Sequence, residues 1–220
     1  MKFMERAVIF DMDGVIVDSE RQWVQSETSF LKQAIPGWNH ADFNKITGMG
    51  VKDLYTFLRE EYEFPYSFDE FWERNETAGV RVYETMVSLI PGFLELAHDL
   101  KGLVQIGLAS SSPRRWIEIV LNRFELETLF DSVVSADDVN GVGKPAPDIY
   151  LYAADQLKCK PGRCVAIEDS RNGALSAKSA GFRVIGFRNG FNHEQDLSMS
   201  DCILEGFEGR RADDIIKYID

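Results

Sequence analysis

Short apolar runs alternate along the chain with longer segments of helical periodicity. The apolar runs are rich in β-branched residues and lack strict polar alternation, which predicts strands buried on both faces. They span residues 7–10, 104–109, 132–136, 164–167 and 183–187. The intervening periodicity predicts helices at 91–101, 113–124, 146–158 and 171–180. This alternation predicts the α/β fold class, with a Rossmann-like parallel sheet covered by helices on both faces.

Residues 19–86 show a different pattern. No strand-like run occurs there, and apolar residues such as Trp23, Phe30 and Leu31 recur at helical spacing. The segment therefore predicts a helical bundle inserted after the first strand. We expect two domains: a core of residues 1–17 and 87–220, and a helical insert of residues 18–86.

Local signals predict where two of the core helices begin. Ser112 is placed to cap the helix that follows it, with Pro113 at the first helical position. Ser170 is placed to cap the helix at 171–180, and Gly181 is placed to end it.

Polar and acidic side chains follow the predicted strands directly. Asp11 and Asp13 follow the first strand and serines 110–112 follow the second. Lys144 lies in the segment GVGKPAPDIY after the third, and residues 168–169 (Glu-Asp) follow the fourth. Ligands of open α/β sheets bind beyond the carboxyl ends of the strands, so we expect these side chains to meet in one site.

Their chemistry fits a divalent cation and a phosphoryl group. Mg²⁺ prefers oxygen ligands, which the carboxylates of Asp11 and Asp169 and the backbone carbonyl of Asp13 would supply. A carboxylate can also attack phosphorus to give an aspartyl-phosphate, while Ser110, the backbone N–H groups of the serine run and Lys144 would hold phosphate oxygens. Each feature alone has an ordinary explanation as a turn, a helix cap or a surface lysine; their joint occurrence after successive strands favours the site.

Composition narrows the classes of partner. The formal net charge of −12 and the absence of any run of five basic residues argue against nucleic-acid and anionic-membrane binding. Three scattered cysteines without a C-x-x-C pair predict reduced thiols. The N-terminal apolar run is short and ends in acid, so we expect neither a signal peptide nor a membrane span. We therefore expect a cytoplasmic protein, and its 220 residues are compatible with a monomer.

Four segments together resemble the signature motifs of the haloacid dehalogenase-like (HAD) hydrolase superfamily. The segments are FDMDGVIVDSE, GLASSSP, GKPAPDIYLYAA and CVAIEDSRNGALSAKSAG. They are most similar to the branch that holds β-phosphoglucomutase and the small-sugar-phosphate phosphatases. The resemblance covers the whole predicted core, and it implies that the helical insert is a cap domain.

The resemblance also implies roles for individual residues. Asp11 would be the nucleophile and Asp13 the general acid/base. Ser110, Ser111 and Lys144 would hold the phosphoryl group. The magnesium ligands that it implies are Asp11, Asp13, Glu168 and Asp169.

Within this branch, the sequence favours a magnesium-dependent phosphatase acting on a small phosphorylated metabolite, such as a sugar or polyol phosphate. Trp23 stands where the resemblance to the mutase implies a histidine, and Trp cannot accept a proton. Lys52 and Arg74 are the candidate insert cations for substrate, and both also fit a solvated helix face. A β-phosphoglucomutase-type phosphomutase, a pyrophosphatase and a binding module without turnover are the alternatives. The segment 188–195 (RNGFNHEQ) has no role assigned by the sequence.

Overall fold

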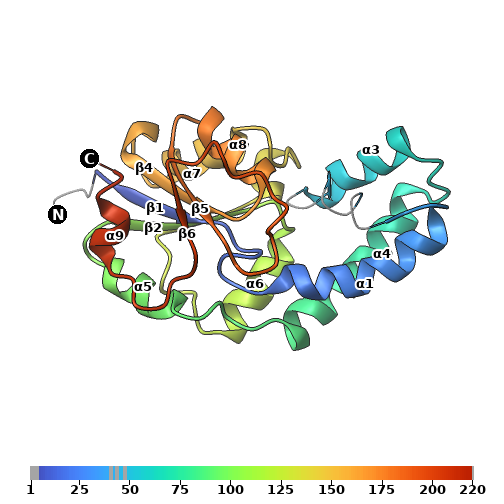
Figure 1. Ribbon diagram of the computed structural model, residues 1–220, viewed down its shortest axis with the longest axis horizontal. Coiled ribbons are helices and arrows are strands. Elements are labelled where there is room, and N and C mark those ends of the chain that lie inside the picture. The colour runs from blue at the N-terminus through green and yellow to red at the C-terminus, as the bar shows by residue number, and fades with distance from the viewer. Residues whose placement is uncertain (1–4, 40–41, 43–44, 47–48, 220) are drawn as a thin grey trace.

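The computed structural model describes residues 5–39, 42, 45–46 and 49–219. Its centre is a six-stranded, wholly parallel sheet of order β3-β2-β1-β4-β5-β6 (Figure 1). The strands are β1 (Ala7–Phe10), β2 (Gln105–Ser110), β3 (Ser132–Ser135), β4 (Cys164–Glu168), β5 (Arg183–Phe187) and β6 (Cys202–Leu204). The predicted fold class is confirmed.

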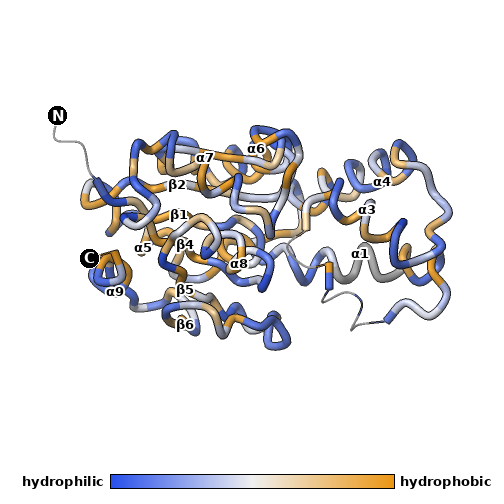
Figure 2. Tube along the Cα trace, turned by 90° about the horizontal axis from the view of Figure 1, so that it is seen from above, coloured by the Kyte–Doolittle hydropathy of each residue, from blue (hydrophilic) through white to orange (hydrophobic). Residues whose placement is uncertain are grey.

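The two faces of the sheet bury different apolar clusters. Val8 and Phe10 point into one cluster, whereas Ala7 and Ile9 point into the other, as the two-residue repeat of a strand requires. Figure 2 shows the hydrophobic stretches of the central strands. The first cluster contains residues of α5 (Phe93–Leu100), α6 (Arg114–Arg123) and α9 (Ala212–Ile216), and the second contains residues of α7 (Asp148–Gln156) and α8 (Arg171–Ser179). Helices therefore cover both faces (Figure 1).

The predicted core elements lie within two residues of their observed bounds. Two further elements, β6 and α9, were not predicted, because they have three and five residues and carry too little periodicity to be recognised. Ser170 caps α8 as predicted, accepting a hydrogen bond from the Gly173 N–H at 3.0 Å. The prediction that Ser112 caps α6 was wrong, because α6 begins one residue later than expected and Pro113 occupies the N-cap position.

The described part of the helical insert contains helices and turns. It comprises α1 (Ser19–Ala34), α3 (Val51–Glu61), α4 (Phe68–Arg81) and a π-helical turn, Val82–Met86. These helices lie beyond one end of the sheet (Figure 1). Their buried residues, including Leu31, Leu58 and Phe71, continue the cluster that contains Val8 and Phe10. The division of the chain into two domains stays a prediction.

The order of the strands in the sheet indicates where a ligand site should lie. After β1 the chain adds β2 and β3 on one side and later β4, β5 and β6 on the other. The boundary between β1 and β4 is therefore a topological switch point, where open parallel sheets form a crevice. None of the described helices is long and apolar enough to cross a lipid bilayer.

Candidate active site

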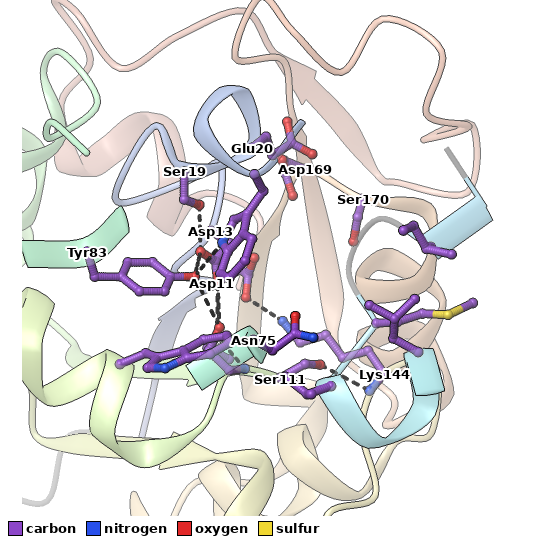
Figure 3. A pocket seen from close by; sticks show the side chains of 18 residues that line it. Asp11, Asp13, Ser19, Glu20, Asn75, Tyr83, Ser111, Lys144, Asp169 and Ser170 are labelled. Carbon is purple, nitrogen blue, oxygen red and sulfur yellow. Dashed lines mark hydrogen bonds and ion pairs between the residues drawn. The ribbon is translucent and has the colours of Figure 1, made fainter. Parts of the chain in front are cut away.

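A pocket with about 110 Å³ of free space lies at the carboxyl ends of β1, β2 and β4, where the helical insert meets the sheet (Figure 3). Its core side carries most of the charged and hydroxyl groups, and the described apolar lining residues of the insert are Trp23, Ile46, Met49, Val51 and Leu54. The described residues that line it are Asp11, Asp13, Ser19, Glu20, Trp23, Ile46, Met49, Val51, Leu54, Asn75, Tyr83, Ser110, Ser111, Ser112, Trp116, Lys144, Asp169 and Ser170.

Lys144 joins two carboxylates from different strands. Its Nζ donates to Asp11 Oδ1 at 2.6 Å, to Glu168 Oε1 at 2.5 Å and to the Ala109 carbonyl at 3.0 Å. The side chain is 2% exposed. Tyr150 also donates to Glu168 Oε1, at 2.5 Å. The ammonium group is thus held in one position by three acceptors.

The charges at this site do not balance. Burial alone would lower the pKa of Lys144, but Asp11 and Glu168 outweigh it and raise that pKa, so the ammonium stays charged. Burial, together with the nearby Glu168 and Asp13, raises the pKa of Asp11 although Lys144 acts to lower it. Burial, followed by the nearby Glu20, also raises the pKa of Asp169. The protein therefore gathers more negative charge here than one lysine offsets.

A divalent cation fits this excess of charge. Asp11, Glu168 and Asp169 each offer one oxygen, and the three oxygens lie within 4.8 Å of one another. An all-oxygen donor set suits a hard cation. This acidic cluster is the candidate metal site.

Asp13 is held by hydroxyl groups from three parts of the chain. Its Oδ1 accepts from Ser19 at 2.5 Å and from Tyr83 at 2.6 Å. Its Oδ2 accepts from Ser112 at 2.8 Å and from Ser110 at 3.4 Å. A hydrogen bond to a charged carboxylate is stronger than one to a neutral acceptor. This explains why the Ser112 hydroxyl donates to Asp13.

Two further hydrogen bonds fix the loop of serines 110–112, and they involve groups that the sequence predicts to hold phosphate. The Ser111 hydroxyl accepts from the Lys144 N–H at 3.3 Å, and the Ser110 hydroxyl accepts from the Ser112 N–H at 3.0 Å. The loop is therefore fixed to Lys144 as well as to Asp13. The phosphate-binding roles of Ser110, Ser111 and Lys144 stay predictions.

The segment 188–195, unassigned by the sequence, is hydrogen-bonded to the acidic cluster through Asp169. Asn189 Nδ2 lies 3.0 Å from both Asp169 Oδ2 and Glu20 Oε2. Asn192 Nδ2 donates to the Asp169 carbonyl at 2.7 Å. These amides orient Asp169, which makes the segment a support of the site.

The three insert residues predicted to meet substrate lie in different places. Trp23 lines the pocket. The Arg74 guanidinium lies 4.3 Å from the centre of the Phe30 ring, and Lys52 lies against Gly141; neither is among the lining residues. Their contact with substrate stays a prediction.

Sequence reasoning missed several residues that the fold brings to the pocket. Tyr83, Asn75 and Trp116 come from helical segments with no motif, so spacing carried no signal for them. Glu20 also lines the pocket and was missed. It follows Ser19 within the recognised FDMDGVIVDSE segment, so its position in that motif could have identified it as a site residue.

Comparison with known proteins agrees with this geometry. The sequence profile described as "Hydrolase: haloacid dehalogenase-like hydrolase" matches residues 5–181. The chain belongs to the haloacid dehalogenase-like hydrolases.

Individual relatives place it in a branch of this family. It is 32% identical over 193 residues to "Phosphorylated carbohydrates phosphatase" of Thermotoga maritima, covering 87% of this chain and 89% of the relative. It is 36% identical over 187 residues to "Hexitol phosphatase B" of Escherichia coli (strain K12), covering 81% and 82%. A solved structure of a "putative beta-phosphoglucomutase" from Thermotoga maritima superposes with a TM-score of 0.65 at 29% identity, covering 96% of this chain and 97% of that one. The resemblance to the branch of β-phosphoglucomutases and sugar-phosphate phosphatases is confirmed.

Proposed function

We propose that this enzyme is a magnesium-dependent phosphatase that hydrolyses a small phosphorylated metabolite, such as a sugar or polyol phosphate, through an aspartyl-phosphate. The observation that carries the proposal is the convergence of Asp11, Lys144, Glu168 and Asp169 at one buried point. The relatives named for phosphatase activity on phosphorylated carbohydrates and hexitols support the substrate class.

In the proposed reaction, an Asp11 carboxylate oxygen forms a bond to phosphorus while the bond to the ester oxygen breaks. Asp13, protonated at the start of the cycle, gives its proton to the departing alkoxide as the bond to the ester oxygen breaks. Asp13 then takes a proton from a water molecule whose oxygen attacks phosphorus, which releases inorganic phosphate and restores Asp11. The Ser19 and Tyr83 hydroxyls fix Asp13 for both transfers.

Mg²⁺ would be held by Asp11, Glu168 and Asp169, with the Asp13 carbonyl as a further predicted ligand. When bound, it would neutralise charge on the phosphoryl oxygens and on the crowded carboxylates. Lys144 contributes a second, fixed positive charge beside Asp11.

Hydrolysis is favoured over phosphomutase chemistry. A phosphomutase working through a sugar bisphosphate must hold a second phosphate, yet Lys144 is the only cation among the described lining residues. Trp23 replaces the titratable histidine implied for a mutase, and its indole N–H already donates to Tyr83 at 3.1 Å.

The proposal places the protein in the cytoplasm. None of Cys159, Cys164 and Cys202 forms a disulfide, as expected in a reducing compartment. A monomeric state stays a prediction.

The test is phosphate release from p-nitrophenyl phosphate. Wild-type protein should be active with Mg²⁺ and inactive after EDTA treatment. Asp11→Asn should lower kcat by at least about 10³-fold, because the nucleophile is lost. The matched control Asp69→Asn changes an exposed aspartate in the first turn of α4 and should retain full activity. An Asp11→Asn variant with more than about a tenth of the wild-type rate would remove the basis of the proposal.

A further inference from the structure

The insert side of the pocket presents apolar surface to the substrate. Its described residues are Trp23, Ile46, Met49, Val51 and Leu54, with Trp116 from α6 beside them. The rings of the two tryptophans lie 5.3 Å apart.

Both indole N–H groups are already satisfied by protein acceptors. Trp23 Nε1 donates to Tyr83, and Trp116 Nε1 donates to Glu76 Oε2 at 2.9 Å. The tryptophans therefore offer carbon surface, which suits the C–H faces of a carbohydrate or polyol chain.

Asn75 is the only polar side chain that α3 and α4 contribute to the described pocket lining. It is 7% exposed, and its Nδ2 donates to the Phe71 carbonyl at 3.0 Å. Its Oδ1 receives no hydrogen bond from the residues that the structure describes. Figure 3 shows the Asn75 side chain among the residues that line the pocket. This oxygen is not among the fully buried side-chain atoms without a hydrogen-bond partner, so part of its surface is accessible and open to a hydrogen bond from a substrate hydroxyl.

The helix that carries Asn75 is fixed against the sheet domain. Gly79, one turn further along α4, packs so closely on Trp116 that an added Cβ would lie 2.2 Å from the indole ring. Glu76 accepts from Arg115 at 2.6 Å as well as from Trp116. The position of Asn75 relative to the phosphoryl site is thus set by packing.

The charge of the residues around the pocket limits which leaving groups can bind. The described insert side of the pocket offers no cation, because Arg74 lies on Phe30 and Lys52 lies against Gly141. A second phosphate or a carboxylate on the leaving group would lose its hydration there without gaining a partner.

We propose that Asn75, Trp23 and Trp116 form a leaving-group subsite for an uncharged, hydroxyl-bearing alcohol carrying a single phosphate. Asn75 Oδ1 accepts a hydrogen bond from a substrate hydroxyl, and the tryptophans cover the carbon chain. This inference rests on the proposed phosphatase activity and narrows its substrates to neutral monophosphates.

The test uses compounds matched in chain length. At six carbons these are sorbitol 6-phosphate, hexyl phosphate without other hydroxyls, and 6-phosphogluconate with a carboxylate. At three carbons they are glycerol 1-phosphate, propyl phosphate and 3-phosphoglycerate. In at least one series, wild-type kcat/KM for the polyol phosphate should exceed that for each matched compound by about tenfold or more.

The decisive variant is Asn75→Leu, which keeps the side-chain volume and removes the acceptor. It should lower the ratio of kcat/KM between polyol and alkyl phosphate by about tenfold or more. Asn122→Leu is the matched control, because Asn122 Nδ2 makes the same bond to a carbonyl four residues earlier but is exposed. Its ratio should equal that of wild type. Asn75→Ser replaces Asn75→Leu if the latter does not fold, with the same expected direction.

Two results would overturn the subsite. One is an unchanged polyol-to-alkyl ratio in the Asn75 variants; the other is a wild-type kcat/KM for the acids equal to that for the polyol phosphates. Either result with phosphate still released from p-nitrophenyl phosphate defeats this inference alone. Absence of phosphate release from every ester by the wild type defeats the proposed function itself.

Discussion

The core side and the insert side of the pocket use polar groups in opposite ways. On the core side, Lys144 contacts three acceptors and Asp13 four hydroxyl donors, so each group is held from several elements. On the insert side, Asn75 has one free acceptor within an apolar wall. Preorganised charge is what phosphoryl transfer requires, whereas a few polar groups on an apolar surface are what discriminate among ligands. The difference predicts that substitutions on the core side change turnover, whereas substitutions on the insert side change the choice of substrate.

Tyr83 connects the two sides. It lies in the π-helical turn at the end of the insert, is 1% exposed, and donates to Asp13 while accepting from Trp23. Burial and the Asp13 carboxylate raise the pKa of Tyr83, so the phenol stays protonated and able to donate.

The largest contrast should appear between two lysines. Lys144→Met leaves Asp11 and Glu168 buried without their cation, and should lower the unfolding free energy by about 3–5 kcal/mol and kcat by ~10²-fold or more. Lys52→Met changes an exposed side chain and should change stability by less than about 0.5 kcal/mol. Urea unfolding and p-nitrophenyl phosphate turnover measure both. Equal effects of the two substitutions would show that a lysine on the core side matters no more than an exposed lysine of the insert.

The second-largest effect is expected when Mg²⁺ binds the acidic cluster on the core side of the pocket. Mg²⁺ at about 100 times its Kd should raise the unfolding free energy of the EDTA-treated protein by about 2.7 kcal/mol. Asp169→Asn should abolish most of this gain, because one carboxylate of the cluster is lost. Thermal unfolding with and without Mg²⁺ reports it, and Asp69→Asn is the control. A full gain in Asp169→Asn would place the cation elsewhere.

A smaller effect is expected where the sides meet. Tyr83→Phe removes the hydroxyl that orients Asp13 and should lower kcat/KM for sorbitol 6-phosphate by about tenfold. The loss should be smaller for p-nitrophenyl phosphate, whose leaving group needs little protonation. Tyr55→Phe, which removes a hydroxyl bonded to the Tyr66 carbonyl in the insert, serves as control. Equal losses on both esters would mean that Tyr83 acts only through packing.

The smallest effect should come from Arg74. Its guanidinium stacks on Phe30 outside the pocket lining, so Arg74→Met should change kcat/KM for sorbitol 6-phosphate by less than about threefold. Steady-state kinetics on the purified variant decides this. A larger loss confined to kcat/KM would show that Arg74 reaches the substrate, as its place in the sequence predicted.

Much of the core could be predicted from sequence because its signals are local. A buried parallel strand shows as a short apolar run, and the residue after each strand lies at the same sheet edge. Asp11, Asp13, Ser110, Lys144 and Asp169 were identified in this way, and the structure brings them together. The short β6 and α9 lacked such periodicity.

The rest depended on contacts between distant segments. Asn75, Tyr83 and Trp116 occupy ordinary helical positions, and only the docking of α4 against α6 turns them toward the sheet edge. Conversely, Arg74 had the expected charge, but the rotation of α4 directs it onto Phe30. The sequence by itself therefore determined the family, the sheet and the acidic chemistry at its edge, since strand periodicity and motif spacing are local properties. The tertiary structure decided which side chains of the insert face the pocket, because helix orientation is set by packing between residues far apart in the chain.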